Sequence, residues 1–317
     1  MIQWGINALN HGSGLAVFKD GIYQTDFISK DQDELPSEFI RKALHYGSPD
    51  RVFWYEDPWA KKARQIYARQ YSTALDMSVL PKRYLKRAGL GYAPVTHTPH
   101  HASHAAAGYY TSPFNHCAVI VLDAIGEFES ATIWNCMHGE MKKVWSAKYP
   151  NSLGLFYSAF TKLVGLTPIR DEYLLQTMAE QGDPDKYKTA VDAYFGPGYV
   201  NLRYNFHRGV LNWSPEPQTL QDQCDIAAAV QRRFELEVAS VFYRAKQLTS
   251  ADCVVYMGGC AMNSQANKFA LSANKFKYVW SMPDPGDASS ALGAVAYHTK
   301  QRIWRYWGPV KHIDIRV

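Results

Sequence analysis

The sequence lacks several features that would assign it to a specialised class of protein. No apolar run approaches the length of a membrane span, and the N-terminal MIQWGINALNHGSG has no basic region followed by an apolar core. The five cysteines show no CxxC spacing. We therefore expect a cytoplasmic chain with no signal peptide and no membrane segment, whose cysteines are reduced thiols.

The remaining composition is typical of a globular protein. Of the 317 residues, 47% are hydrophobic and 20% charged, which allows one large domain or two ordinary ones. The net charge of +5 permits a phosphate-bearing ligand. Basic and aromatic residues alternate in RVFWYEDPWAKKARQIYARQY and in PKRYLKRAGLGY. Such mixing can serve nucleotide binding, but it more often marks an amphipathic helix with a solvated basic face, which is the interpretation we adopt.

Two stretches of the sequence share one pattern. IQWGINALNHGSGLAVFKDGIYQTDF and AVIVLDAIGEFESATIWNCMHGEMKKVWSA each read as an apolar strand followed by a hairpin, with KDG and HGE as the turns. The first strand of each ends at a polar residue, Asn7 or Asp123. We therefore predict a duplicated α/β domain over residues 1–317, with halves of about 1–112 and 113–317 around a central cleft.

Three further segments carry candidate functional residues. PHHASHAAAGYY is alanine-rich, which predicts a helix with His100 and His104 one turn apart on one face. In ADCVVYMGGCAMNSQAN a strand runs into Gly258 and Gly259, where a ligand could approach the backbone closely. PGDASSALGAV begins a helix at Asp287, a position at which aspartate is usually an N-cap. Taken alone each signal is weak, since an isolated HxxxH pair usually packs or caps a helix.

Five motifs in order resemble a known family: GINALNHGSGLAVFKDG, HHASHAAAGYYTSPFNHCAVIVLDAIGE, SLGLFYSAFTKLVGL, GGCAMNSQAN and PGDASSALGAV. They resemble the N-terminal domain of the O-carbamoyltransferases of nodulation and antibiotic biosynthesis. That domain is similar to the tRNA threonylcarbamoyladenosine transferases. The resemblance covers about residues 2–300 and implies a duplicated RNase H-like fold of the actin, sugar-kinase and chaperone superfamily.

The resemblance implies a metal site. In the family, the HxxxH histidines and one aspartate from each of two later motifs bind a metal reported as iron. The matching residues here are His100, His104, Asp123 and Asp287. Two imidazoles and two carboxylates suit iron(II) or another first-row divalent metal acting as a Lewis acid. His97 and His101 have no such match, and we interpret them as surface residues.

The resemblance also implies a nucleotide site and a catalytic base. Gly258, Gly259 and Asn263 match the family turn that binds the adenosine of ATP or carbamoyl-adenylate. Glu172 lies where the family reads EYKVMGLAPYG, and it would hold ribose hydroxyls. His11 matches a histidine of the first turn, which would act as general base toward an acceptor hydroxyl or orient a ligand.

Two departures from the family pattern affect the expected chemistry. After Glu172 the motif is eroded, since Leu174 replaces a lysine and Thr177 a glycine. Family members also continue into a second domain with a GRxEFGPRALGxRS motif, which makes carbamoyl-adenylate from carbamoyl phosphate and ATP, and we expect that domain to be absent here. Either a separate protein supplies carbamoyl-adenylate or this chain uses a carbamoyl donor directly, and the sequence leaves both routes open.

We expect an O-carbamoyltransferase that modifies an acceptor hydroxyl. A 5-hydroxymethyl pyrimidine nucleotide or DNA is the preferred acceptor, because a protein of net charge +5 does not attract cationic aminoglycosides. The phosphate contacts would come from Lys82, Arg83, Lys86 or Arg87, and a neutral sugar is the alternative acceptor. Two other hypotheses are a tRNA-type relative that adds to an amine of adenosine and a non-catalytic nucleotide-binding subunit. SLGLFYSAFTKLVGL and LDAIGE disfavour the first, and the complete set of metal-site residues disfavours the second.

Overall fold

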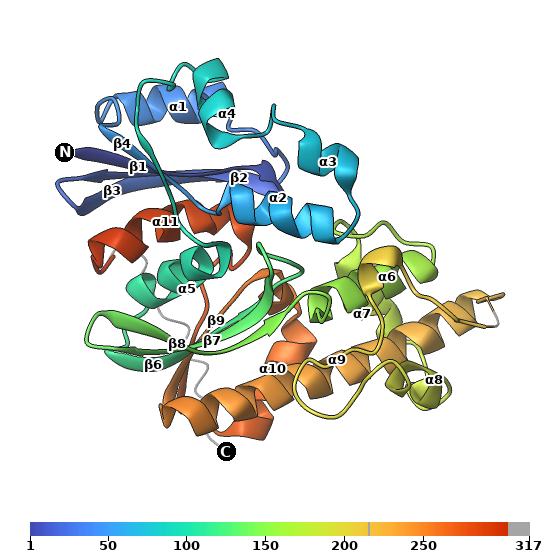
Figure 1. Ribbon diagram of the computed structural model, residues 1–317. Coiled ribbons are helices and arrows are strands. Elements are labelled where there is room, and N and C mark those ends of the chain that lie inside the picture. Colours follow the sequence, from blue (N-terminus) through green and yellow to red (C-terminus); the bar gives the residue numbers. More distant parts are fainter. Residues whose placement is uncertain (215, 304–317) are drawn as a thin grey trace.

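The computed structural model describes residues 1–214 and 216–303, and within them ten strands form two five-stranded sheets (Figure 1). The first sheet contains β1 (Ile2–Asn10), β2 (Gly12–Lys19), β3 (Ile22–Ser29), β4 (Arg51–Trp54) and β5 (Val95–His97). The second contains β6 (His116–Leu122), β7 (Glu129–Met137), β8 (Glu140–Lys148), β9 (Cys253–Met257) and β10 (Tyr278–Trp280). Their orders, β3-β2-β1-β4-β5 and β8-β7-β6-β9-β10, are equivalent: three antiparallel strands and then two parallel ones.

Both predicted hairpins are present at the predicted turns. Asp20 and Gly21 connect β2 to β3 with φ values of 53° and 79°. His138 and Gly139 connect β7 to β8 with φ values of 51° and 84°. Two consecutive positive φ angles match the right-handed twist of the flanking strands, as a type I′ turn requires. The repeated hairpin is therefore a real duplication in the fold.

The end of β1 differs from its expected place. We expected the strand to stop at Asn7, but it continues to Asn10 through a bulge between these two residues. In the second half, Asp123 does follow the last residue of β6 directly. The bulge bends β1, and the side chains of Asn7 and Asn10 both hydrogen-bond to Asp287 in the other half of the molecule.

The helices form layers around and between the sheets. They are α1 (Ser37–Leu44), α2 (Pro58–Tyr67), α3 (Tyr71–Leu75), α4 (Pro81–Arg87), α5 (His100–Thr111), α6 (Leu153–Leu163), α7 (Glu172–Ala179), α8 (Lys188–Asp192), α9 (Leu220–Thr249), α10 (Ser264–Asn274) and α11 (Ser290–Thr299). Helices α5 and α11 lie between the two sheets, α1 and α4 lie outside the first sheet, and α9 and α10 lie outside the second (Figure 1). None of these helices combines the length and the apolar character that a membrane crossing requires.

Glycines allow α11 to pack against the first sheet and against α5. A Cβ atom on Gly5 would lie 1.8 Å from the carbonyl oxygen of Ala291 in α11, and one on Gly14 would lie 2.1 Å from that of Ala288, just before α11. A Cβ atom on Gly293 would lie 1.8 Å from the carbonyl oxygen of Ser103 in α5. Helix α11, from the second half, therefore completes the core of the first. The predicted boundary between the halves near residue 112 stays a prediction. Residues 304–317 lie outside the described residues. They include 307–317, the segment where the resemblance places the start of the second domain.

The basic and aromatic segment that includes α2 does not form the amphipathic helix that we expected. Its first residues form β4, and in α2 the exposed groups are aromatic rather than basic. Lys62 and Arg64 are only 7% exposed, whereas Trp59 and Tyr67 are 57% and 67% exposed. Lys62 is buried because its ammonium donates to carbonyl groups at the end of α3, including that of Ala74 at 2.9 Å. The later helix α4 does present a solvated basic face.

Candidate metal and nucleotide site

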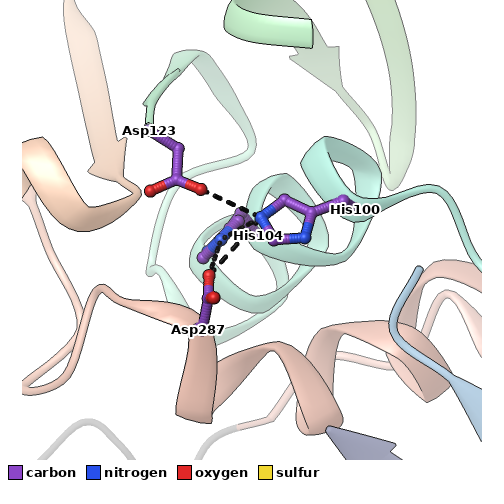
Figure 2. A group of neighbouring side chains, drawn as sticks. All are labelled: His100, His104, Asp123 and Asp287. Atoms are coloured by element: carbon purple, nitrogen blue, oxygen red, sulfur yellow. Dashed lines mark hydrogen bonds and ion pairs between the residues drawn. The ribbon is translucent and has the colours of Figure 1, made fainter. Parts of the chain in front are cut away.

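Four side chains from three parts of the fold converge between the two halves (Figure 2). His100 and His104 lie on α5, Asp123 follows β6, and Asp287 precedes α11. Their nitrogen and oxygen ligand atoms all lie within 4.8 Å of one another. His100 Nε2 is 3.0 Å from Asp123 Oδ2, while His104 Nε2 is 3.0 Å from Asp287 Oδ1 and 3.1 Å from His100 Nε2.

The role of Asp287 differs from the one that its position in the sequence predicts. It makes no N-cap hydrogen bond, and its Oδ1 instead faces His104. Asn10 Nδ2 donates to Asp287 Oδ2 at 2.8 Å, and Asn7 Nδ2 donates to the Asp287 backbone carbonyl at 2.8 Å. The bulged end of β1 therefore fixes this carboxylate from the opposite half.

Each of the other three cluster residues also has an outer partner. The backbone N–H of Gly259 donates to Asp123 Oδ1 at 3.1 Å, and Ser290 Oγ lies 3.2 Å from His104 Nδ1. The backbone N–H of His100 donates to Glu127 Oε1 at 2.9 Å. The contacts to the Asp123 carboxylate and to the His104 ring orient these side chains and tune their basicity, whereas Glu127 fixes the backbone at His100. Sequence reasoning missed Asn10 and Glu127, although both stand inside quoted motifs, NHGSG and LDAIGE.

The two buried carboxylates require a positive charge beside them. Burial alone would lower the pKa of His100, but Asp287 and Asp123 outweigh it and raise that pKa well above its ordinary value. Burial raises the pKa of Asp123, yet the neighbouring imidazoles bring it down to about 2. The pKa of Asp287 is likewise held well below its ordinary value by His100 and His104, against the effect of burial. The raised pKa of His100 favours its protonated form, which places a positive charge beside the two carboxylates.

The donor set fits a divalent transition metal. Ligand atoms about 2.1 Å from one ion and 90–110° apart are separated by about 3.0–3.4 Å. Four of the six pairs of ligand atoms have these separations, at 3.0, 3.0, 3.1 and 3.4 Å, the last between His100 Nε2 and Asp287 Oδ1, and all six lie within 4.8 Å. Two imidazole nitrogens with two carboxylate oxygens are a usual ligand set for iron or a similar first-row ion. A divalent cation would replace the proton that otherwise balances the carboxylates.

The predicted nucleotide-binding turn lies directly beside the cluster. Gly258 has a φ of +93°, and a Cβ atom there would lie 2.2 Å from the carbonyl oxygen of Leu122, so the turn requires glycine. Asn263 caps α10, accepting from the backbone of Ala266 at 3.0 Å, and pairs with Gln231. Its amide therefore supports the turn from within the protein.

The remaining predicted residues are farther from the cluster centre. Glu172, at the start of α7, accepts a hydrogen bond from Ser158 Oγ at 2.8 Å and another from the backbone of Ile169. His11 is exposed in the turn between β1 and β2, one residue after Asn10. The structure thus places His11 near the residues that hold Asp287.

The interpretation of His101 as a surface residue is wrong. Its side chain is completely buried, with Nδ1 lying 3.1 Å from Thr132 Oγ1. Every residue of α5 is buried because the helix is enclosed by both sheets. His97, at the end of β5, is partly exposed.

The fold and this site define a duplicated RNase H-like protein with a candidate metal cluster between its halves. Residues 54–296 match the model of the carbamoyltransferase N-terminus family. The chain belongs to this family, and the resemblance drawn from the five motifs is confirmed.

Two curated relatives and one solved structure are similar to this chain. An uncharacterized protein of Synechocystis is 29% identical over 92% of this chain and 55% of its own length. The nodulation protein NolNO of Sinorhizobium fredii is 25% identical over 78% of this chain and 36% of its own length. The chain thus spans about half the length, or less, of these curated relatives. The crystal structure of T. kodakarensis HypF matches with a TM-score of 0.51 and 13% identity, covering 95% of this chain and 48% of that one, which is a likeness of fold.

Proposed function

We propose that this chain transfers a carbamoyl group to an acceptor hydroxyl at the His100–His104–Asp123–Asp287 cluster. The observation that carries this proposal is the convergence of these four ligand atoms within 4.8 Å in a member of the carbamoyltransferase N-terminus family. The four residues would hold iron(II) or another divalent metal. Bound there, the metal would supply Lewis acidity toward the carbamoyl carbonyl or the bridging phosphate.

The other residues bind and orient the reactants in this proposal. The turn at Gly258 and Gly259 takes the adenosine of the donor, and Glu172 takes its ribose hydroxyls. His11 accepts the proton of the attacking hydroxyl as general base or orients that hydroxyl. The support for its role is that His11 follows Asn10, which hydrogen-bonds to the cluster through Asp287.

The proposed donor is carbamoyl-adenylate, formed from carbamoyl phosphate and ATP. It is delivered by a separate adenylate-forming protein, or this chain uses a carbamoyl donor directly. All five cysteines are free thiols, which suits a reducing compartment, and we place the reaction in the cytoplasm.

The proposed acceptor is a 5-hydroxymethyl pyrimidine, in a nucleotide or in DNA. The support is the exposed basic face of α4, which includes Lys82, Arg83, Lys86 and Arg87. The test supplies the protein with carbamoyl phosphate, ATP, iron(II) and each candidate acceptor, with and without an adenylate-forming partner. Mass spectrometry should find one added carbamoyl group on the pyrimidine. Carbamoylation of a neutral sugar alone would refute the acceptor and leave carbamoyl transfer standing.

The metal assignment has its own test. Untagged protein should contain one divalent metal, and His104→Ala should lose most of the metal and the activity, because a ligand is removed. His116→Ala is the matched control, since His116 lies outside the cluster and contacts Asn135. Full metal content in His104→Ala by elemental analysis would show that the cluster is not the metal site.

A further inference from the structure

The positive charge of the chain is concentrated in residues 58–92. These residues include eight Lys or Arg and one Asp, a formal charge of +7, whereas the whole chain carries +5. The remainder of the chain is therefore net acidic, at −2. The segment contains α2, α3, α4 and the loop to β5. Lys62 and Arg64 are buried and Lys61 pairs with Glu56, so the exposed cations are those of Arg69, Lys82, Arg83, Lys86 and Arg87. A surface with this excess of positive charge attracts polyanions and repels polycations.

The exposed cations of this segment are unneutralised. Arg69, Lys82, Arg83 and Lys86 are exposed and form no ion pair with another described residue. Arg87 donates to a backbone carbonyl and lies over a tyrosine ring. Elsewhere, surface lysines commonly pair with carboxylates, as do Lys42, Lys143, Lys186, Lys277 and Lys300. The exposed cations of 58–92 are thus available to an external anion.

Exposed aromatic side chains are concentrated in the same segment. Nine tyrosine or tryptophan side chains are exposed among the described residues, and four of them are Trp59, Tyr67, Tyr71 and Tyr92. These four are between 56% and 67% exposed. Rings that remain in water on a basic surface provide faces on which bases can stack.

Hydrogen bonds connect the three helices of this segment, α2, α3 and α4 (Figure 1). The Lys62 ammonium of α2 donates to the carbonyl of Ala74 in α3 at 2.9 Å. Arg87 of α4 donates to the carbonyl of Ser78, in the segment after α3, at 3.0 Å. Lys82 and Tyr92 line one hollow of about 250 Å³. A cation and an aromatic ring at one hollow suit a phosphate and a base of one nucleotide.

This surface adjoins the metal cluster through α2. Asp57, the N-cap of α2, donates its backbone N–H at 2.8 Å to the same Glu127 oxygen that accepts from His100. At the other end of α2, the ring of Tyr67 packs against Phe128, with centroids 6.4 Å apart. Both ends of the helix therefore contact the segment that follows Asp123.

We propose that residues 58–92 form a binding surface for a single-stranded polynucleotide, with α4 contacting phosphates and the exposed rings stacking on bases. The surface would guide a base that carries the acceptor hydroxyl toward the cluster, and in that role it rests on the proposed function. Binding itself is independent of carbamoyl transfer and is tested separately.

The test measures fluorescence anisotropy of a labelled twelve-residue deoxythymidine strand between 50 and 200 mM NaCl. Wild-type protein should bind, with an affinity that falls as salt rises. Lys82→Gln/Lys86→Gln should weaken binding and reduce the logarithmic salt slope by about 1.4, since each phosphate contact on a single strand contributes about 0.7. Tyr92→Ala should weaken binding about fivefold or more with an unchanged salt slope. The matched controls, Lys268→Gln on α10 and Tyr243→Ala on α9, should bind as wild type does.

Several outcomes would overturn the proposal. These are no binding of the strand at 50 mM NaCl, equal losses in the control variants, tighter binding of a duplex, or thymidine monophosphate binding as tightly as the strand. Carbamoyl transfer to a small hydroxyl compound is measured in parallel. If it persists while the strand does not bind, the surface is refuted and the proposed function is retained. If the strand binds and no carbamoyl acceptor is found, the surface stands and the proposed function fails.

Discussion

The contact between α5 and α11 predicts that Gly293→Ala will damage the proposed metal site without touching a proposed ligand. The added Cβ would lie 1.8 Å from Ser103 O, and real Cβ atoms essentially never approach closer than 3.0 Å. The helices must therefore separate by about 1.2 Å. His104 lies next to Ser103, and Asp287 lies just before α11, so the separation acts on their 3.0 Å contact.

The size of the effect follows from two opposing terms. Overpacking of a close helix contact costs about 1–3 kcal/mol, and the clash here belongs at the upper end. Alanine in place of glycine returns about 1 kcal/mol through helix propensity. The net loss should be about 2 kcal/mol, seen as a fall in Tm of about 4 °C. Widening the 3.0 Å contact toward 4 Å takes the two ligand atoms outside the separation of about 3.0–3.4 Å expected for neighbouring ligands of one ion, and metal affinity should fall at least about tenfold.

Thermal unfolding in the presence of a chelator measures the change in Tm, and competition with a chromophoric chelator measures the change in metal affinity. Ala294→Gly is the matched control, because it weakens the same helix by about 1 kcal/mol without adding an atom to the contact. Gly293→Ala with wild-type Tm and metal affinity would refute the packing argument. Equal loss of metal affinity in Ala294→Gly would show that general destabilisation, not helix separation, empties the site.

Three further substitutions test other contacts. Asn10→Ala removes the 2.8 Å hydrogen bond to Asp287 and should weaken metal binding about ten- to a hundredfold in chelator competition, and unchanged affinity would contradict its positioning role. Gly259→Val should weaken ATP or AMP binding in calorimetry while the protein remains folded, and unchanged affinity would rule out the proposed adenosine turn. Arg302→Ala should lower the free energy of urea unfolding by about 2 kcal/mol. The Arg302 guanidinium donates to the Tyr109 carbonyl at 2.7 Å and lies 4.1 Å from the centroid of the Tyr109 ring. An unchanged urea midpoint would contradict this prediction.

The sequence predicts those elements whose signals are local. The hairpin turns follow from Asp-Gly and His-Gly between alternating strands, and α5 follows from its run of alanines. The burial of His101 could not be predicted in this way, because it depends on two sheets that enclose α5 from opposite sides. The burial of the basic side chains of α2 likewise depends on tertiary contacts, since the Lys62 ammonium donates to a carbonyl group of the next helix.

The convergence of the cluster depends on both halves of the chain. Asp123 belongs to the second sheet, whereas Asp287 is held by Asn7 and Asn10 of the first. The histidines lie on the helix enclosed between the sheets, and α11 crosses back to the first half through contacts that only glycine permits. The spacing of residues along the chain does not show these contacts between the halves. For this reason the two histidines taken alone indicate an ordinary helix pair, and Asp287 taken alone indicates an N-cap. Only the five motifs in family order predicted that these four residues group together. The contact between Asn10 and Asp287 could not be predicted, because it depends on the bulge at the end of β1.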